Sequence, residues 1–201
     1  TFGMPPGRVI GLIAGGDRAL RHPVENAEDN PMRGWEELQE HGINTDDTVV
    51  GIAASGTTPY VVHALHEARA HGILTASICS NPDAPISREA DIPIEMIVGP
   101  EFVTGSSRMK SGTGQKMILN MISTATMIRL GHVKGNRMVN MQLTNDKLVA
   151  HGCWSMNWDC PTRRHKPCSC ATVRSAKPSM RQGQSVRSPP PPKHVTIIIK
   201  V

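Results

Sequence analysis

A short turn rich in hydroxyl side chains is the first stretch of this chain whose residue types suit ligand binding. Ser55-Gly56-Thr57-Thr58 follows a run of β-branched residues and precedes Pro59 and an apolar-periodic segment. A turn between a strand and a helix directs hydroxyls and the first helical amides at one spot, where the helix dipole favours an anion. Gly56 lets a ligand approach the backbone, and Pro59 costs little near a helix start. The pattern predicts a phosphate site at Ser55, Gly56, Thr57 and Thr58, with an N-capped helix that binds no ligand as the alternative.

A second hydroxyl-rich turn precedes a longer apolar-periodic segment. It contains Ser106, Ser107, Arg108 and Lys110. Lys110 could supply positive charge to a phosphate or a hydrogen bond to a sugar hydroxyl, although a solvated lysine near a helix start is the alternative. Two such turns form a more specific pattern than either one alone.

Two carboxylates are the candidates for proton transfer. Glu25 and Glu28 lie three residues apart in a segment that reads as a short helix, so they are expected to share a face. A partly buried carboxylate near a sugar could take a proton from a carbon next to a carbonyl or imine. A solvated acidic helix start is the alternative, because Asp and Glu favour that position.

The elements that must position these residues alternate between strands and helices. The sequence predicts strands at residues 8–14, 49–52, 74–79 and 92–96, short helical pieces at 24–29 and 35–40, a helix at 59–71 and a long helix after the second turn. This alternation indicates an α/β fold, a three-layer αβα sandwich around a parallel sheet. Ligands of such sheets bind at the carboxyl ends of the strands, where both turns are expected.

Charge is distributed unevenly along the 201 residues. The overall formal charge is +5, but the first 152 residues hold 13 Lys and Arg against 16 Asp and Glu, and residues 153–201 hold nine against one. A nucleic-acid-binding role is therefore not indicated for the apolar-rich part. The five cysteines do not form a disulfide framework in a chain of this size, which favours a reducing, cytoplasmic compartment. No apolar run is long enough to span a membrane, and no signal peptide is visible.

Several common ligand motifs are absent from the sequence. It contains no Walker motif, no Gly-x-Gly-x-x-Gly and no histidine spacing typical of a metal site. We therefore expect no cofactor and no metal. A zinc site formed by Cys160, His165, Cys168 and Cys170 is an alternative for the cysteine cluster, although ligand spacing alone is a loose criterion.

At several motifs the sequence closely resembles the bacterial N-acetylmuramic acid 6-phosphate etherases. The resemblance runs from residue 1 to about residue 150. Its motifs are Thr1-Phe-Gly3, Val9-Ile-Gly-Leu-Ile-Ala-Gly-Gly16, Val24-Glu25-Asn-Ala-Glu28-Asp29, Val49-Val-Gly-Ile-Ala-Ala-Ser-Gly56, Thr58-Pro-Tyr60, Cys79-Ser-Asn-Pro82 and Val103-Thr-Gly-Ser-Ser-Arg-Met-Lys110.

The resemblance implies a sugar-isomerase (SIS) domain and cleavage of the D-lactyl ether of N-acetylmuramic acid 6-phosphate in peptidoglycan recycling. The family works without metal, by elimination and then water addition with two glutamates. Glu28 matches one of them, and Glu25 becomes a supporting candidate. Ser55, Thr58, Ser106 and Ser107 would contact the phosphosugar. The family also implies a homodimer for the intact protein.

The sequence departs from this family at both ends. It begins at Thr1, and the other glutamate and a first phosphate loop of type Gly-x-Gly-Thr-Ser-Gly would come before that residue. We therefore expect an N-terminal truncation and little or no etherase activity. A non-catalytic phosphosugar-binding module, similar to the glucokinase regulatory protein, is the alternative function, and a purely structural remnant is a third.

The segment after about Gly152 lacks helical periodicity, and a shifted reading frame accounts for it. In this frame, each new codon consists of the last base of one codon and the first two bases of the next. The genetic code then allows only Leu at the junctions Cys153-Trp154 and Asn157-Trp158, and only Gly at Trp158-Asp159. The recovered sequence has the apolar spacing of two helices. We therefore expect two regions, a partial SIS domain at residues 1–150 and a basic, disordered tail without a native fold at residues 151–201.

Overall fold

The computed structural model describes residues 4–138 and 195–199, the latter as backbone. Five strands form one parallel sheet in the order β1-β7-β2-β3-β4, and β5 and β6 form a separate antiparallel pair. The strands of the sheet are β1 (Val9–Ile13), β2 (Thr48–Ile52), β3 (Leu74–Cys79), β4 (Ile92–Glu95) and β7 (Val195–Ile199). The helices are the 3₁₀ helix η1 (Gly16–Leu20), α1 (Pro31–Glu40), α2 (Pro59–Ala70), α3 (Pro85–Arg88) and α4 (Lys110–Arg129).

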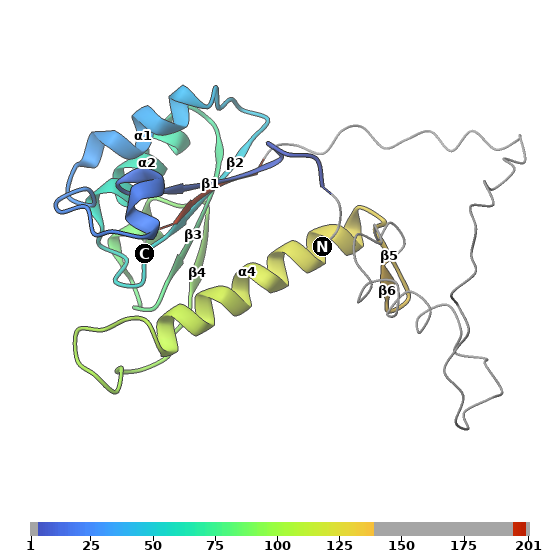
Figure 1. The fold of residues 1–201 in the computed structure, drawn as a ribbon. Helices are drawn as coiled ribbons and strands as arrows, with labels where there is room; N and C mark the ends of the chain where they lie inside the picture. Colours follow the sequence, from blue (N-terminus) through green and yellow to red (C-terminus); the bar gives the residue numbers. More distant parts are fainter. Residues whose placement is uncertain (1–3, 139–194, 200–201) are drawn as a thin grey trace, which may run out of the picture.

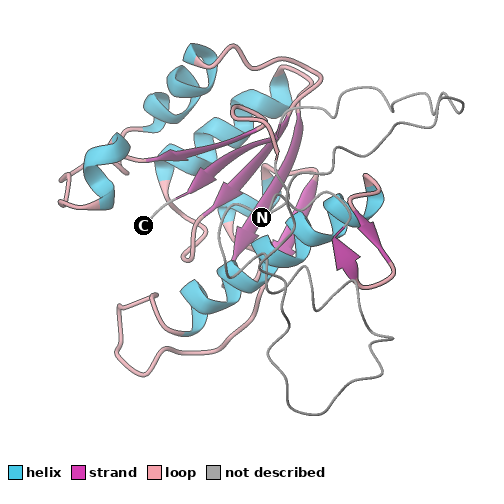
Figure 2. Cartoon of the chain, turned by 45° about the vertical axis from the view of Figure 1, so that its right-hand side comes forward, coloured by secondary structure: helices cyan, strands magenta, loops and turns pink. Residues whose placement is uncertain are grey.

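Helices cover both faces of the sheet, with α1 and α2 on one side and α4 on the other (Figures 1 and 2). The alternation of side chains along β2 explains the two layers. Val49 packs with Leu38 and Leu65 of the α1 and α2 layer, whereas Val50 and Ile118 of α4 belong to the opposite core. The predicted three-layer αβα arrangement is therefore confirmed.

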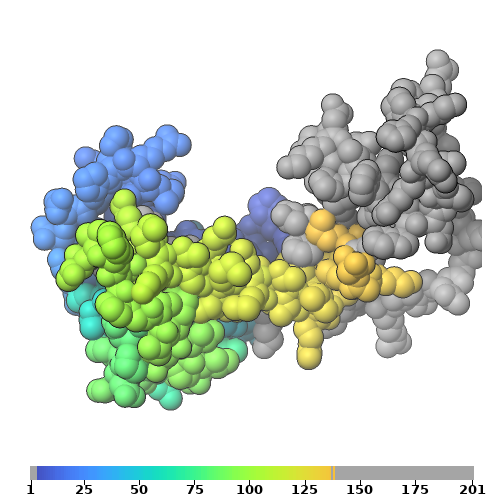
Figure 3. Space-filling view, turned by 90° about the horizontal axis from the view of Figure 1, so that it is seen from below, coloured from blue at the N-terminus to red at the C-terminus, as the bar shows by residue number. Residues whose placement is uncertain are grey.

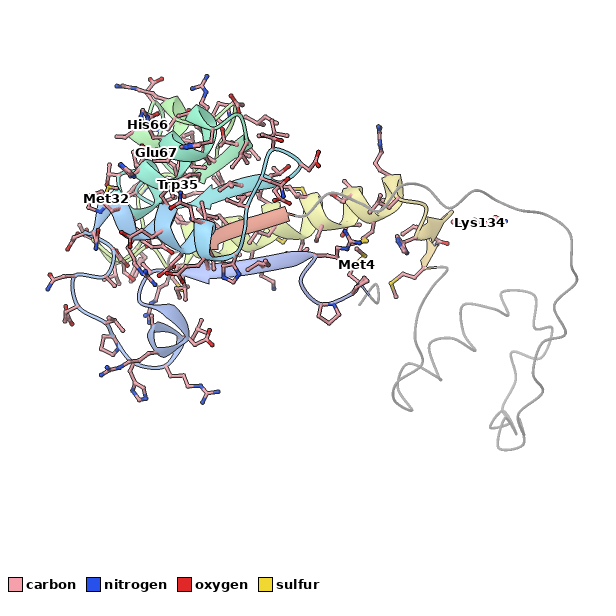
Figure 4. The ribbon with its side chains drawn as sticks, turned by 90° about the horizontal axis from the view of Figure 1, so that it is seen from above. Met4, Met32, Trp35, His66, Glu67 and Lys134 are labelled. Atoms are coloured by element: carbon pink, nitrogen blue, oxygen red, sulfur yellow. The ribbon has the colours of Figure 1, made fainter. Side chains whose placement is uncertain are left out.

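Most predicted elements match the structure to within a few residues. The helical prediction for residues 24–29 was wrong, because this segment forms consecutive turns and Asn26 adopts a left-handed backbone with φ of 59°. The short helix α3 and the β5 (Val133–Lys134) and β6 (Arg137–Met138) pair were not predicted. Figure 4 places Lys134 of β5 at the far end of α4, away from Trp35 and the sheet.

The tail differs from the expectation at five residues. Val195–Ile199 was expected to be disordered, but it forms β7 and pairs in parallel with β1 on one side and β2 on the other. Val, Thr and Ile have high strand propensity, and the run contains no proline or glycine. Residues 139–194, including the candidate zinc ligands, lie outside the described residues.

The contact between α1 and α2 depends on a glycine. The Cβ of an alanine at position 34 would overlap the backbone oxygen of Tyr60 and lie 3.0 Å from the Cβ of Ala64. The same interface holds a short hydrogen bond of 2.5 Å from the Tyr60 hydroxyl to Glu37. Burial and this carboxylate raise the pKa of Tyr60, so the hydroxyl stays protonated and keeps donating.

We therefore expect Gly34→Ala to lower the free energy of unfolding by about 2–3 kcal/mol, because a backbone atom blocks the added methyl group. Gly112→Ala is the matched control, since its Cβ would meet only an ordinary contact of 3.5 Å, to the Ser107 oxygen. Removing a glycine from a helix should leave stability unchanged or raise it by up to about 1 kcal/mol. Urea unfolding of both variants measures the difference, and equal stabilities would contradict the steric argument.

Candidate functional site

The first hydroxyl-rich turn connects β2 to α2. The Ser55 hydroxyl accepts hydrogen bonds from the amide and the hydroxyl of Thr57, at 3.2 and 3.1 Å. Gly56 has a φ of 75°, and a Cβ there would overlap the Cβ of Ala84, so the turn requires glycine. The sequence of this turn therefore sets a compact geometry that leaves Ser55 and Thr57 exposed.

The amides at the start of α2 are already paired within the protein. Pro59 has no amide hydrogen, the Tyr60 amide donates to the Glu28 carbonyl at 3.1 Å, and the Val61 amide donates to the Thr58 carbonyl at 3.1 Å. The prediction of unpaired amides at this helix start was therefore wrong. The bond from Tyr60 instead ties the turn that carries Glu28 to the α2 start, which holds the backbone of Glu28 beside the first turn.

The second hydroxyl-rich turn, which we call the 101–110 loop, leads from β4 into α4 (Figure 1). In the space-filling view, this yellow-green part of the chain lies at the surface (Figure 3). The carboxylate of Glu101 accepts hydrogen bonds from the amides of Lys110 and Ser111, both at 3.0 Å. The Lys110 ammonium group donates to the carbonyl of Pro100 at 2.8 Å. These three bonds hold the two ends of the loop together, as in compact surface loops whose ends lie close.

A cavity of about 1010 Å³ lies between the sheet and the 101–110 loop. It brings together four of the predicted site residues, Glu28, Ser55, Ser106 and Ser107. The two hydroxyl-rich turns therefore face one space at the carboxyl ends of the parallel strands, with a carboxylate on the wall.

The other predicted residues do not line this cavity. Gly56, Thr57 and Thr58 lie beside it without forming its wall, and Thr58 is buried. Lys110 points its ammonium group at Pro100 and also lies off the wall. Glu25 lines a second cavity of about 360 Å³, which shares Glu28 with the first.

The structure adds wall residues to which the sequence analysis assigned no role. Arg108 is exposed and lines the cavity, so it takes the position of the cation that was expected of Lys110. Ser80 and Asn81 follow β3 directly and also lie on the wall. Asn81 donates from its side-chain amide to the Ser55 carbonyl at 2.9 Å, which fixes the first turn to the end of β3. Ser80 and Asn81 follow a predicted strand, and this position was the sequence feature that could have identified them as site residues.

One carboxyl group on the cavity wall, that of Glu101, has a shifted pKa. The backbone amides of Lys110 and Ser111 hold the pKa of the Glu101 carboxyl below its usual value. Glu101 is therefore ionised at neutral pH and accepts both bonds as a carboxylate.

The described residues contain no group of three or more His, Cys, Asp or Glu side chains that could hold a metal ion. Over the same part of the chain, no helix has the length and apolar character needed to cross a membrane.

Family models match most of the folded region. Residues 37–125 match the SIS domain, and residues 3–69 match the N-terminal SIS domain of the glucokinase regulatory protein. A solved structure of a candidate phosphosugar isomerase from Bacillus subtilis aligns with a TM-score of 0.38 and 21% identity over 59% of this chain and 37% of that one. That alignment is too weak to add to the argument.

Curated relatives match this chain at high identity. N-acetylmuramic acid 6-phosphate etherases from Bacteroides fragilis and Porphyromonas gingivalis are each 76% identical over 152 residues, which is 76% of this chain and 54% and 56% of the relatives. The etherase of Edwardsiella ictaluri is 58% identical over 149 residues, 74% of this chain and 50% of its own length. The chain thus spans about half the length of these relatives. It is a homologue of the N-acetylmuramic acid 6-phosphate etherases and carries an SIS domain.

Proposed function

We propose that this chain provides the phosphosugar-binding part of an N-acetylmuramic acid 6-phosphate etherase. The reaction would cleave the D-lactyl ether of N-acetylmuramic acid 6-phosphate and yield N-acetylglucosamine 6-phosphate and D-lactate in peptidoglycan recycling. The observation that carries this proposal is the single cavity on which Ser55, Ser106, Ser107 and Glu28 meet. Relatives that bear this name at 76% identity support it.

The cavity contains the groups that a phosphorylated sugar requires. Serine hydroxyls donate hydrogen bonds to phosphate oxygens or accept them from sugar hydroxyls, and the guanidinium of Arg108 provides positive charge and a planar set of donors. These groups would fix the substrate, and they leave the carboxylate of Glu28 as the candidate for proton transfer.

Glu28 would act in a carbon–oxygen lyase reaction that proceeds by elimination and then water addition. The carboxylate takes a proton from the carbon next to a carbonyl, the electron pair forms a carbon–carbon double bond, and the bond to the lactyl oxygen breaks. Lactate leaves after gaining a proton, and water then adds across the double bond. Glu101 is the other carboxylate on the wall of the 1010 Å³ cavity, which we call the main cavity. Because Glu101 already binds the amides at the start of α4, Glu28 is the better placed base.

Titration of the chain with N-acetylglucosamine 6-phosphate, together with a D-lactate release assay on N-acetylmuramic acid 6-phosphate, tests the proposal. We expect saturable binding of the product by the chain, and little or no lactate release from it. Any turnover that is observed should disappear in Glu28→Gln, which keeps the shape of the side chain and removes the base. If the chain does not bind the phosphosugar at all, the proposed function is wrong.

The match of residues 3–69 to the glucokinase regulatory protein favours a second candidate, a phosphosugar-binding module without chemistry. This candidate predicts the same binding but no lactate release by any longer form of the protein. Lactate release by a chain extended to the full length of the relatives would exclude it.

Three further properties belong to the same proposal. The intact protein would act as a cytoplasmic homodimer, would need neither metal nor cofactor, and would bind neither nucleic acid nor membrane. The first 150 residues would provide every group of the phosphosugar site, and the remaining residues would contribute only β7 to the sheet.

A further inference from the structure

The start of α4 is capped by a residue that lies outside the helix. Met109, the residue before the helix, makes no side-chain capping bond. Glu101 performs this role from nine residues upstream, because its two carboxylate oxygens accept the amides of Lys110 and Ser111 separately. The next amides are paired too, since Gly112 donates to the Ser107 carbonyl at 2.9 Å and Thr113 donates to the Met109 carbonyl at 3.0 Å.

This pairing decides which groups α4 and its loop can offer to an anion. A helix N-terminus usually binds anions through its unpaired amides and its dipole. Here a carboxylate of the protein already occupies that position, and it lies on the wall of the main cavity. The polar side chains that remain on this part of the cavity wall include the hydroxyls of Thr104, Ser106 and Ser107 and the guanidinium of Arg108.

The same carboxylate also sets the shape of the loop. Residues 102–105 and 107–109 are exposed, and Phe102 is 96% exposed, so little apolar packing holds the loop. The bonds of Glu101 to Lys110 and Ser111 join its two ends, and the bond from the Lys110 ammonium group to Pro100 supports them. Ser111 is buried, which anchors this junction to the body of the domain.

We propose that Glu101 is a positioning residue of the phosphosugar site, which caps α4 and thereby holds Ser106, Ser107 and Arg108 on the cavity wall. This inference rests on the proposed function for the identity of the ligand. It assigns to Glu101 no contact with the reacting atoms. The site would then take its phosphate through loop side chains and not through the amides of α4.

Glu101→Gln tests the proposal, because glutamine keeps the length and one acceptor oxygen but replaces the other oxygen with a donor. Glu95→Gln is the matched control, since Glu95 is an exposed glutamate at the end of β4 that lies off the cavity wall, and its loss changes the net charge equally. Both 201-residue variants would be compared with the unmodified chain in two measurements, one without a ligand and one with N-acetylglucosamine 6-phosphate.

Amide hydrogen exchange, followed by NMR, is the measurement without a ligand. We expect exchange at Lys110 and Ser111 to be about tenfold faster in Glu101→Gln and unchanged in Glu95→Gln, because a bond to an ionised acceptor is lost only in the first. Exchange in β3 should be the same in all three chains, which shows that the domain is folded. Unchanged exchange at Lys110 and Ser111 would overturn the capping role.

Affinity for N-acetylglucosamine 6-phosphate is the second measurement. We expect Glu101→Gln to bind about tenfold more weakly and Glu95→Gln to bind like the unmodified chain. Faster exchange with unchanged affinity would show a purely structural cap and overturn the positioning role. Tighter binding by Glu101→Gln would show that the carboxylate competes with the phosphate, which also overturns it. If the unmodified chain does not bind the sugar, the proposed function fails, and the exchange measurement still decides whether Glu101 holds the loop.

Discussion

A chain that ends at His194 should lose the hydrogen-exchange protection of β1, with exchange at Val9–Ile13 at least about 100-fold faster than in the full chain. β7 is the strand that pairs with β1 in the described sheet, over five residues from Val9↔Val195 to Ile13↔Ile199. It also pairs with β2 over five residues. Without β7, β1 has no strand beside it in the described sheet, and its own packing is weak because Val9 is 55% exposed.

A chain that ends at Ile199 is the control for this experiment, since it removes two residues beyond β7 and leaves the strand intact. Exchange in β3 provides the internal reference, because β3 pairs with β2 and β4 and should stay protected in both shortened chains. Mass spectrometry of peptides that cover residues 8–14 and 74–79 measures both strands. Equal protection of β1 in the two shortened chains would show that pairing with β7 does not hold it.

Replacing Arg108 with glutamine should weaken the binding of N-acetylglucosamine 6-phosphate by about 10- to 100-fold. Arg108 lines the cavity next to Ser106 and Ser107, within reach of a ligand with which its guanidinium would make charge-assisted hydrogen bonds. Such bonds in a partly enclosed site are among the strongest polar interactions that a protein makes with an anion. Calorimetric titration at fixed ionic strength measures the change, because exposed charges are screened by salt.

Lys110→Gln is the matched control for Arg108, since it removes the same charge two residues away. We expect its affinity to fall less than about threefold, because the ammonium group lies off the cavity wall and the two bonds between Glu101 and backbone amides still close the loop when its bond to Pro100 is lost. This result would separate a direct contact from a general change in electrostatic field. A larger effect at Lys110 than at Arg108 would mean that the loop rearranges when the sugar binds.

The sequence predicted the fold class correctly because its local signals agree. The buried run at β2, the hydroxyl-rich turn after it and the apolar periodicity of α2 each predict the element that forms. The helix expected at residues 24–29 failed because Asn26 adopts a left-handed backbone, which residue pattern alone does not reveal. β7 could not be predicted either, since its pairing with β1 and β2 joins segments far apart in the chain.

The residue types at the candidate site could be predicted from the sequence, but the orientations of their side chains could not. Hydroxyl-rich turns after two strands determined that Ser55, Ser106 and Ser107 would meet at one edge of the sheet, because parallel strands end there together. Only the tertiary structure decided that Arg108 lies on the cavity wall, that Lys110 turns to Pro100, and that Glu101 occupies the start of α4. The positions of these three side chains depend on how the ten-residue loop closes. Hydrogen bonds between residues that sequence spacing does not place together set that closure.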